Sequence, residues 1–365
     1  MHPATAPRDD RSDTRLLAVD RRSGALRDAG ITDLAALLRP GDLLVVNDAA
    51  TLPASLRARR VGPAGEGDEL ELRLTGGGDG SDPGGGSRVR AVLFGAGDWR
   101  SPTERRPAPP SLAPGDVLAL LGPDGPVPQD MSLVTATVEA VDPRARRLLT
   151  LRIDRSGAAL WAALYRLGRP VQYSYLGAPL ALWSVQTAFA ARPWAAEMPS
   201  AGRPLSWSTL LDLRRRGVEI VALTHAAGLS STGDPALDAL LPLPERYEIP
   251  AETVAAIART RARGGRVIAA GTTVVRALEG CFADRGELYP GPGETALLLH
   301  AGFVPRVVDG LLTGMHDPSE SHFHLLRAFA PEPVLMAAWR HASAEGYLQH
   351  EFGDATLLAP DLALA

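Results

Sequence analysis

The chain has 365 residues, of which 45% are hydrophobic and 22% charged, so it is long enough for two domains and typical of a soluble globular protein. All 38 basic residues are arginine, and the net charge of −4 gives no support for a nucleic-acid partner, although a local arginine patch is compatible with it. Cys281 is the single cysteine, which excludes an internal disulfide and a thiolate zinc site and fits a reducing cytoplasm.

The beginning of the chain does not have the pattern of a secretory signal. Its first residues, "MHPATAPRDDRSDTR", are charged and rich in proline. No apolar run free of charges approaches the roughly 18 residues of a membrane-spanning helix. We therefore expect a disordered segment over residues 1–14, a cytoplasmic location and no membrane partner.

The next segment predicts the start of an α/β domain. Residues 15–48 are typical of a strand, a turn, a short helix and a second strand. The helix "ITDLAALL" has Thr32 as a candidate N-cap and ends before Pro40. The run "DLLVVND" at 42–48 is continuously apolar, which predicts a strand buried on both faces.

Residues 56–159 have a different pattern, which predicts an inserted β-barrel domain. "ELELRLT" at 69–75 and "RVRAVLF" at 88–94 alternate with period two, and a glycine-rich loop over 76–87 joins them. The segments "DVLALLG", "LVTATVEAV" and "RLLTLRI" are further short strands. Several short strands at this spacing indicate an antiparallel barrel or sandwich.

From residue 160 the α/β pattern returns. Helices are predicted over 205–217, 250–265 and 274–282, and strands over 218–228, 266–273, 294–300 and 306–314. Because strands alternate with helices, most of the pairing should be parallel. The predicted fold is an α/β class protein: a mostly parallel-sheet α/β domain from 15–55 and 160–365, with the antiparallel β-barrel inserted.

The sharpest candidate site is "RVIAAGTTVVRALE" at 266–279. A buried strand ends in Gly271, Thr272 and Thr273, and a helix begins at once. Ligands of α/β sheets bind beyond the carboxyl ends of strands, where hydroxyls and exposed N–H groups can hold a polar group. The alternative is an ordinary capped helix.

Two other stretches contain acid–base candidates. His225 ends a predicted buried strand in "LTHAAGLSSTGD", where it is either a proton-transfer group or a structural histidine. Glu245 in "PERYE" is a candidate base or part of a solvated loop.

The stretch "TGMHDPSESHFHLL" contains three of the eight histidines. His322 and His324 would point the same way in an extended segment, and with Glu320 they suggest a metal site. No second cluster with ligand spacing is nearby, which weighs against the metal site.

Six motifs of this chain resemble motifs of the S-adenosylmethionine:tRNA ribosyltransferase-isomerase family of queuosine biosynthesis, and they follow one another along the chain in the same order. "GRVIAAGTTVVRALE" is close to that family's "RVIAVGTTxVRxLE", and "GFVPRVVDGLLTGMHDP" resembles its "GYxFxxVDxLxTNFHLP". "PGDLLVVND", "VQTAFA", "PSAG" and "FGDATLL" match four further motifs, so the resemblance covers nearly the whole chain.

The resemblance implies a particular reaction. The ribosyl part of S-adenosylmethionine is transferred to 7-aminomethyl-7-deazaguanine in tRNA and isomerised to an epoxycyclopentanediol, while adenine and methionine leave. S-adenosylmethionine is then a co-substrate, tRNA a possible partner, and no metal is expected. This chemistry needs a base near the carbon beside the sulfonium, a pocket for adenine and a binder for the methionine ends.

Residue by residue, the resemblance implies the site. The predicted catalytic residues are His316, His225 and Glu245. The predicted S-adenosylmethionine-binding residues are Gly271, Thr272, Thr273, Arg276, Gln186, Ser200, Ala201, Gly202 and Asp354. Simpler roles are open for some of them: Arg276 and Glu279 have i,i+3 spacing for a helix pair, Asp354 is a turn-capping type, and Gln186 is able to bind backbone.

Several polar residues of the family motifs are replaced in this chain. The family's "HxMHxE" is "LLPLPE" here, "GLHF" has become Gly202-Arg203-Pro204-Leu205, Ala50 replaces an arginine and Gly314 an asparagine. Two alternatives therefore stay open: a paralogue acting on a small-molecule acceptor, or a binding protein that has lost catalysis. The protein is expected to be a monomer or homodimer.

Overall fold

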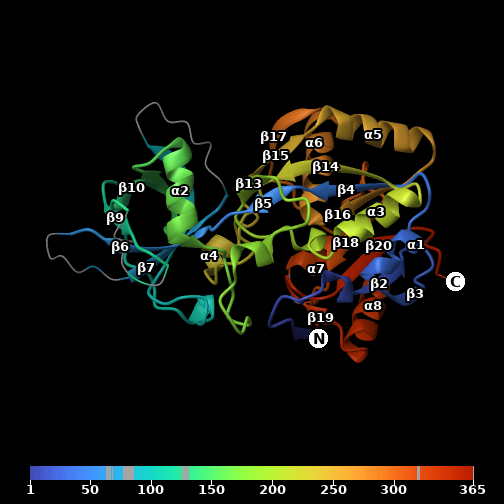
Figure 1. The fold of residues 1–365 in the computed structure, drawn as a ribbon, viewed down its shortest axis with the longest axis horizontal. Helices are drawn as coiled ribbons and strands as arrows, with labels where there is room; N and C mark the ends of the chain where they lie inside the picture. The colour runs from blue at the N-terminus through green and yellow to red at the C-terminus, as the bar shows by residue number, and fades with distance from the viewer. Residues whose placement is uncertain are drawn as a thin grey trace.

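A barrel and an α/β sheet domain lie beside each other along the longest axis of the molecule (Figure 1). The structure is a computed structural model, and it describes residues 1–62, 67, 69–76, 86–123, 125, 131–318 and 321–364. Most of the predicted loop over 76–87 lies outside the described residues.

The barrel is antiparallel and closed. Its strands follow in the order β6 (Ser55–Arg60), β7 (Glu69–Leu74), β8 (Ser87–Phe94), β11 (Leu148–Ile153), β10 (Val134–Val141) and β9 (Val117–Leu120). Strand β9 pairs back onto β6, which closes the ring. Helix α2 (Gly157–Leu167) packs Leu160, Leu164 and Leu167 into the barrel core, and β12 (Gly168–Arg169) pairs with β6. The predicted inserted barrel is confirmed.

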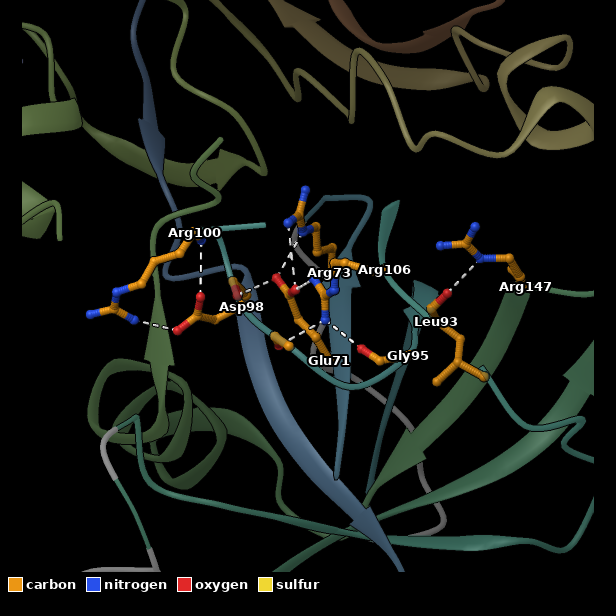
Figure 2. A network of polar contacts seen from close by, with 10 residues as sticks. Glu71, Arg73, Leu93, Gly95, Asp98, Arg100, Arg106 and Arg147 are labelled. Atoms are coloured by element: carbon orange, nitrogen blue, oxygen red, sulfur yellow. Dashed lines mark hydrogen bonds and ion pairs between the residues drawn. The ribbon is translucent and has the colours of Figure 1, made fainter. Parts of the chain in front are cut away.

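One end of the barrel contains a buried charge cluster, seen in Figure 2 with both guanidinium groups directed at Glu71. Arg73 Nε donates to Glu71 at 2.7 Å, and Arg106 donates to the other carboxylate oxygen. The three side chains are at most 6% exposed. The two arginines lower the pKa of Glu71 to about 2, against the opposing effect of burial. The cluster therefore carries one uncompensated positive charge inside the barrel.

The α/β domain is built on one mixed sheet. From edge to edge its strands are β17 (Gly291–Thr295), β15 (Glu245–Ile249), β14 (Glu219–His225), β4 (Leu43–Asn47), β16 (Val267–Ala270), β18 (Gly310–Gly314), β20 (Ala355–Ala359), β2 (Arg15–Asp20) and β3 (Leu26–Gly30). The central strands β14, β4, β16 and β18 are parallel, while the pairs β15–β14, β18–β20 and β2–β3 are antiparallel. The α/β class is confirmed, with parallel pairing concentrated at the centre.

Strand β4 explains why the sheet is covered on both faces. Because side chains alternate along a strand, Leu43 and Val45 join one apolar core, and Leu44 and Val46 join the other. The first core is covered by α5 (Ala251–Ala262), α6 (Thr272–Arg285), α7 (Ser321–Leu326) and α8 (Glu332–Ala344). The second is covered by α1 (Leu34–Leu37) and α3 (Trp207–Arg215).

Short elements connect these parts. Strand β13 (Arg192–Ala195) pairs with β5 (Ala49–Thr51) where the chain passes between the two parts, and α4 is Pro235–Asp238. Short 3-10 helices lie at Arg11–Asp13, Ile31–Asp33, Thr103–Arg105, Leu182–Val185 and Ser200–Gly202. The strand predicted over 294–300 ends at Thr295.

The N-terminal segment, for which the sequence predicts disorder, lies against the C-terminal part of the chain. Strand β1 (His2–Pro3) pairs with β19 (Leu348–Gln349), and Arg8 forms an ion pair of 2.6 Å with Asp354. None of the helices in the described part of the chain has the length and apolar character needed to span a membrane.

We predict that Glu71→Gln destabilises the fold by about 3–5 kcal/mol, because it leaves two buried guanidinium groups without their carboxylate. Urea unfolding at pH 7 measures this loss. Because the folded pKa of Glu71 is depressed, its stabilisation is complete above about pH 4.5 and is lost as the pH falls toward about 2.

The matched control for that experiment is Glu69→Gln on the same strand. Glu69 pairs with Arg57 across the barrel surface and is 46% exposed. We expect a loss of at most about 1 kcal/mol in this control. Equal unfolding curves for both variants would contradict the role of the buried cluster.

Candidate functional site

A cavity of about 810 Å³ lies where the parallel strands of the central sheet reach their carboxyl ends. Strand β16 leads into Gly271 and strand β18 ends at Gly314, and both residues line the cavity. Eight of the predicted site residues line it: His316, Glu245, Gly271, Thr272, Thr273, Arg276, Ser200 and Ala201. The sequence-based expectation that these distant motifs meet is therefore consistent with the structure.

Asn47 ties three of these strand ends together. It is the last residue of β4, and its side-chain amide accepts from His225 N at 2.9 Å and donates to His225 O at 3.0 Å. The same amide donates to Thr273 Oγ1 at 3.2 Å. The sequence analysis did not select Asn47, although a polar residue at the end of a wholly buried strand marks such a position.

Helix α6 begins at the cavity without a side-chain cap. Gly271 occupies the N-cap position with a φ of 99°, which is unfavourable for residues with a Cβ. Thr272 and Thr273 are the first two residues of the helix, so neither of them occupies the N-cap position. The exposed first-turn N–H groups and the positive end of the helix dipole make this a suitable place for an anionic group.

A buried ion pair lies beside the helix start. Arg276 donates through Nη1 to Glu245 Oε2, and Gly228 N donates to Glu245 Oε1 at 2.6 Å. Arg276 Nε donates to Leu297 O at 3.1 Å, and its Nη2 has no hydrogen-bond partner among the described residues. Burial raises the pKa of Glu245, while Arg276 and the Gly228 N–H oppose the increase.

The helix pair suggested by the spacing of Arg276 and Glu279 is not formed. Glu279 instead accepts hydrogen bonds of 2.8–2.9 Å from the backbone N–H groups of residues 306–308. This carboxylate therefore holds the loop before β18, and Arg276 is available to the cavity.

His225 lies behind Glu245 and is not among the described residues that line the cavity. It is fully buried, and its Nε2 is 3.4 Å from Glu245 Oε2. Burial, with a smaller effect of Arg276, lowers the pKa of His225 to about 3. Its imidazole is therefore neutral at pH 7, which suits it to position Glu245.

His316 lines the cavity, and its Nε2 lies 3.0 Å from Thr313 Oγ1. The prediction of an extended segment around His322 and His324 is wrong, because residues 321–326 form helix α7. In a helix, residues two positions apart point to different sides. Glu320 and the side chain of His322 lie outside the described residues, and within these no group of three potential metal ligands occurs.

Three predicted binding residues contact other parts of the protein and do not line the cavity. Gln186 exchanges two 2.9 Å hydrogen bonds with the backbone of Thr51, the backbone role left open for it. Asp354 accepts from Arg8, Arg15 N and Leu348 N. Gly202 packs beside Phe189, where an added Cβ would lie 2.9 Å from the ring. None of the three is among the described residues that line the cavity.

Five further residues that line the cavity were not predicted from the sequence: Tyr173, Tyr175, Glu197, His350 and Glu351. The Tyr173 hydroxyl donates to Glu197 and the Tyr175 hydroxyl donates to Glu351. The spacing of the two tyrosines in "VQYSY" would place both on one side of an extended segment. This spacing is the feature of the sequence from which they could have been predicted to line a site together.

We predict that the His225 imidazole does not titrate between pH 5 and 8. Because the unfolded histidine binds a proton near pH 6.5 and the folded one only near pH 3, this residue lowers stability as the pH falls between these values. The His225 Cε1–H resonance, assigned from a His225→Gln variant, should keep its chemical shift over this range. A titration midpoint near pH 6.5 would contradict the buried placement.

Comparison with known proteins agrees with this architecture. The model of the family described as "Queuosine biosynthesis protein" matches residues 2–358. The S-adenosylmethionine:tRNA ribosyltransferase-isomerase of Acidithiobacillus ferrooxidans is 37% identical over 98% of this chain and 94% of its own length. The protein of the same name from Anaeromyxobacter dehalogenans is 38% identical over 97% of this chain and 95% of its own length.

A solved structure shares the fold. The crystal structure of S-adenosylmethionine tRNA ribosyltransferase from Thermotoga maritima covers 97% of this chain and 95% of its own, with a TM-score of 0.51 and 23% identity. The family match and the sequence relatives establish that the chain belongs to the queuosine biosynthesis protein family.

Proposed function

We propose that this protein is an S-adenosylmethionine:tRNA ribosyltransferase-isomerase. It transfers and isomerises the ribosyl moiety of S-adenosylmethionine onto 7-aminomethyl-7-deazaguanine in tRNA, with S-adenosylmethionine as co-substrate. The relatives carry this name over nearly their full length, which supports the same activity here. These comparisons favour neither a small-molecule acceptor nor a binding protein without catalysis.

The observation that carries the proposal is the charge of the cavity. Among the described residues that line it, four are carboxylates (Glu197, Asp238, Glu245 and Glu351) and one is a guanidinium (Arg276). S-adenosylmethionine carries a sulfonium and an ammonium against one carboxylate, and the acceptor base carries a primary amine. An acidic cavity complements both substrates, because opposite charges attract strongly where water is partly excluded.

The start of helix α6 suits the anionic end of S-adenosylmethionine. The first-turn N–H groups of α6 and the unpartnered Nη2 of Arg276 are donors that a carboxylate can accept from. The hydroxyls of Thr272 and Thr273 are further donors at the same end. Glu245, held by Arg276, is placed to bind ribose hydroxyls.

Proton transfer in this proposal is assigned to His316. It lies on the cavity wall with Thr313 orienting its ring, as a general base needs. His225 stays one layer behind and fixes Glu245. In this reaction the ribosyl part of S-adenosylmethionine is transferred to the acceptor base, and adenine and methionine leave.

The direct test incubates the protein with S-adenosylmethionine and tRNA that carries the 7-aminomethyl-7-deazaguanine base. We expect adenine release that depends on both substrates. Release that is equally fast without tRNA, or absent although S-adenosylmethionine binds, would contradict the proposal.

We further predict that Arg276→Met raises the Kd for S-adenosylmethionine by about 10- to 100-fold, the size expected for a lost charge-assisted hydrogen bond. Isothermal titration calorimetry measures this change. The matched control is Arg285→Met at the other end of the same helix, where the guanidinium lies over Tyr289. An unchanged Kd in Arg276→Met would remove Arg276 from the binding site.

A further inference from the structure

The residues that line the cavity differ in exposure. Beside α6, Glu245 and Arg276 are only 7% and 6% exposed. Tyr173, Tyr175 and His350 are half-buried, and they line the more exposed part of the cavity, its open end. A small molecule can fill the deeply buried part, whereas a base attached to a macromolecule has to enter from the open end.

The open end contains a stack of three rings. The centroids of Tyr173 and Tyr175 are 6.1 Å apart, those of Tyr175 and His350 are 4.4 Å apart, and each pair is inclined by 13°. His350 adopts a left-handed φ of 69°, which costs free energy for a residue with a Cβ. Parallel rings at a cavity mouth are the usual platform for an unstacked nucleobase.

A carboxylate lies at the edge of this stack. The Tyr173 hydroxyl donates to Glu197 Oε1, and Ser230 N lies 3.2 Å from Glu197 Oε2. Burial raises the pKa of Glu197, although these hydrogen bonds and nearby Arg73 oppose the increase. A carboxylate of this kind both attracts a cation and accepts its proton more readily than an exposed one does.

The barrel's charge cluster supports this edge from behind. The Arg73 guanidinium lies 5.5 Å from the centroid of the Tyr173 ring and 4.4 Å from that of Phe94. Glu71 holds Arg73 in place by accepting a hydrogen bond of 2.7 Å from its Nε (Figure 2). The positive charge of the cluster opposes the increase in the pKa of Glu197 that burial causes.

We propose that Tyr173, Tyr175, His350 and Glu197 form the subsite for the acceptor, a purine-like base carrying a primary ammonium group. This inference rests on the proposed function. The rings stack on the base, and Glu197 binds the ammonium and takes one proton from it. The balance is R–NH3⁺ plus carboxylate giving R–NH2 plus carboxylic acid, which leaves a nitrogen lone pair for attack on the ribosyl carbon.

The adenine of S-adenosylmethionine is the competing occupant of the stack. Adenine has no cationic substituent, so a carboxylate at the edge of the stack gives it no charge-assisted contact. The acceptor base has such a substituent on its five-membered ring. The charge at the edge of the stack therefore favours the acceptor.

The test compares two anticodon stem-loop RNAs that differ only at the modified base. One carries 7-aminomethyl-7-deazaguanine, and the other carries the neutral 7-cyano analogue, which stacks equally well and has no ammonium. Fluorescence anisotropy gives the Kd of each RNA for the full-length protein saturated with a non-reacting S-adenosylmethionine analogue.

We expect the wild type to bind the aminomethyl RNA about tenfold or more tightly than the cyano RNA. In Glu197→Gln this ratio falls to about one, with the Kd of the cyano RNA unchanged within about twofold. Glu248→Gln, which neutralises a carboxylate paired with Arg192 outside the lining, keeps the wild-type ratio. A wild type without discrimination, or Glu197→Gln with the full ratio, overturns the inference.

Two further variants keep the outcome interpretable. If Glu197→Gln fails to fold, Tyr173→Phe is the alternative, because it keeps the ring and removes the hydrogen bond to Glu197. Losing this hydrogen bond should raise the pH at which amine-dependent turnover reaches half its maximum. An unchanged pH profile overturns the inference. Tyr175→Leu should weaken RNA binding and leave S-adenosylmethionine binding intact, and the reverse places adenine on the stack. Tightly bound S-adenosylmethionine with no tRNA-dependent adenine release would instead refute the proposed function.

Discussion

The buried ion pair between Glu245 and Arg276 is the interaction on which the cavity depends. It joins strand β15 to helix α6, and Glu245 also binds Gly228 N and faces His225. Removing either partner would leave a buried charge uncompensated, which is costly in a protein interior. The same pair sets the local electrostatics, because Arg276 supplies the one guanidinium among the described lining residues.

Charge is divided between the two parts of the molecule. The barrel contributes the buried Glu71–Arg73–Arg106 cluster behind one wall, and the α/β domain contributes the start of α6 at the other. Between them lie mainly carboxylates, as suits substrates that carry a sulfonium and an amine. The net charge of −4 is compatible with a tRNA substrate whose reacting base is cationic.

Sequence patterns predicted the fold well where burial is periodic. The continuous apolar run of β4 and the alternating β7 and β8 were placed correctly, because these patterns report which faces are covered. Motif resemblance selected Thr272, Arg276 and His316, which line the cavity. Gln186 and Asp354, also selected by the resemblance, do not line it, and their polar groups bind the backbone of Thr51 and Arg8. Their hydrogen-bond partners are distant in the sequence, so spacing could not have predicted these contacts. Tyr173 and Tyr175 were not selected, although their spacing would place both on one side of an extended segment.

The most direct test of the account is a crystal structure of the protein with S-adenosylmethionine bound. The account predicts the methionine carboxylate at the first turn of α6 beside Arg276, with the rings of Tyr175 and His350 still stacked on each other and clear of adenine. Adenine stacked on Tyr175 at the open end, or the co-substrate lying outside this cavity, would contradict it.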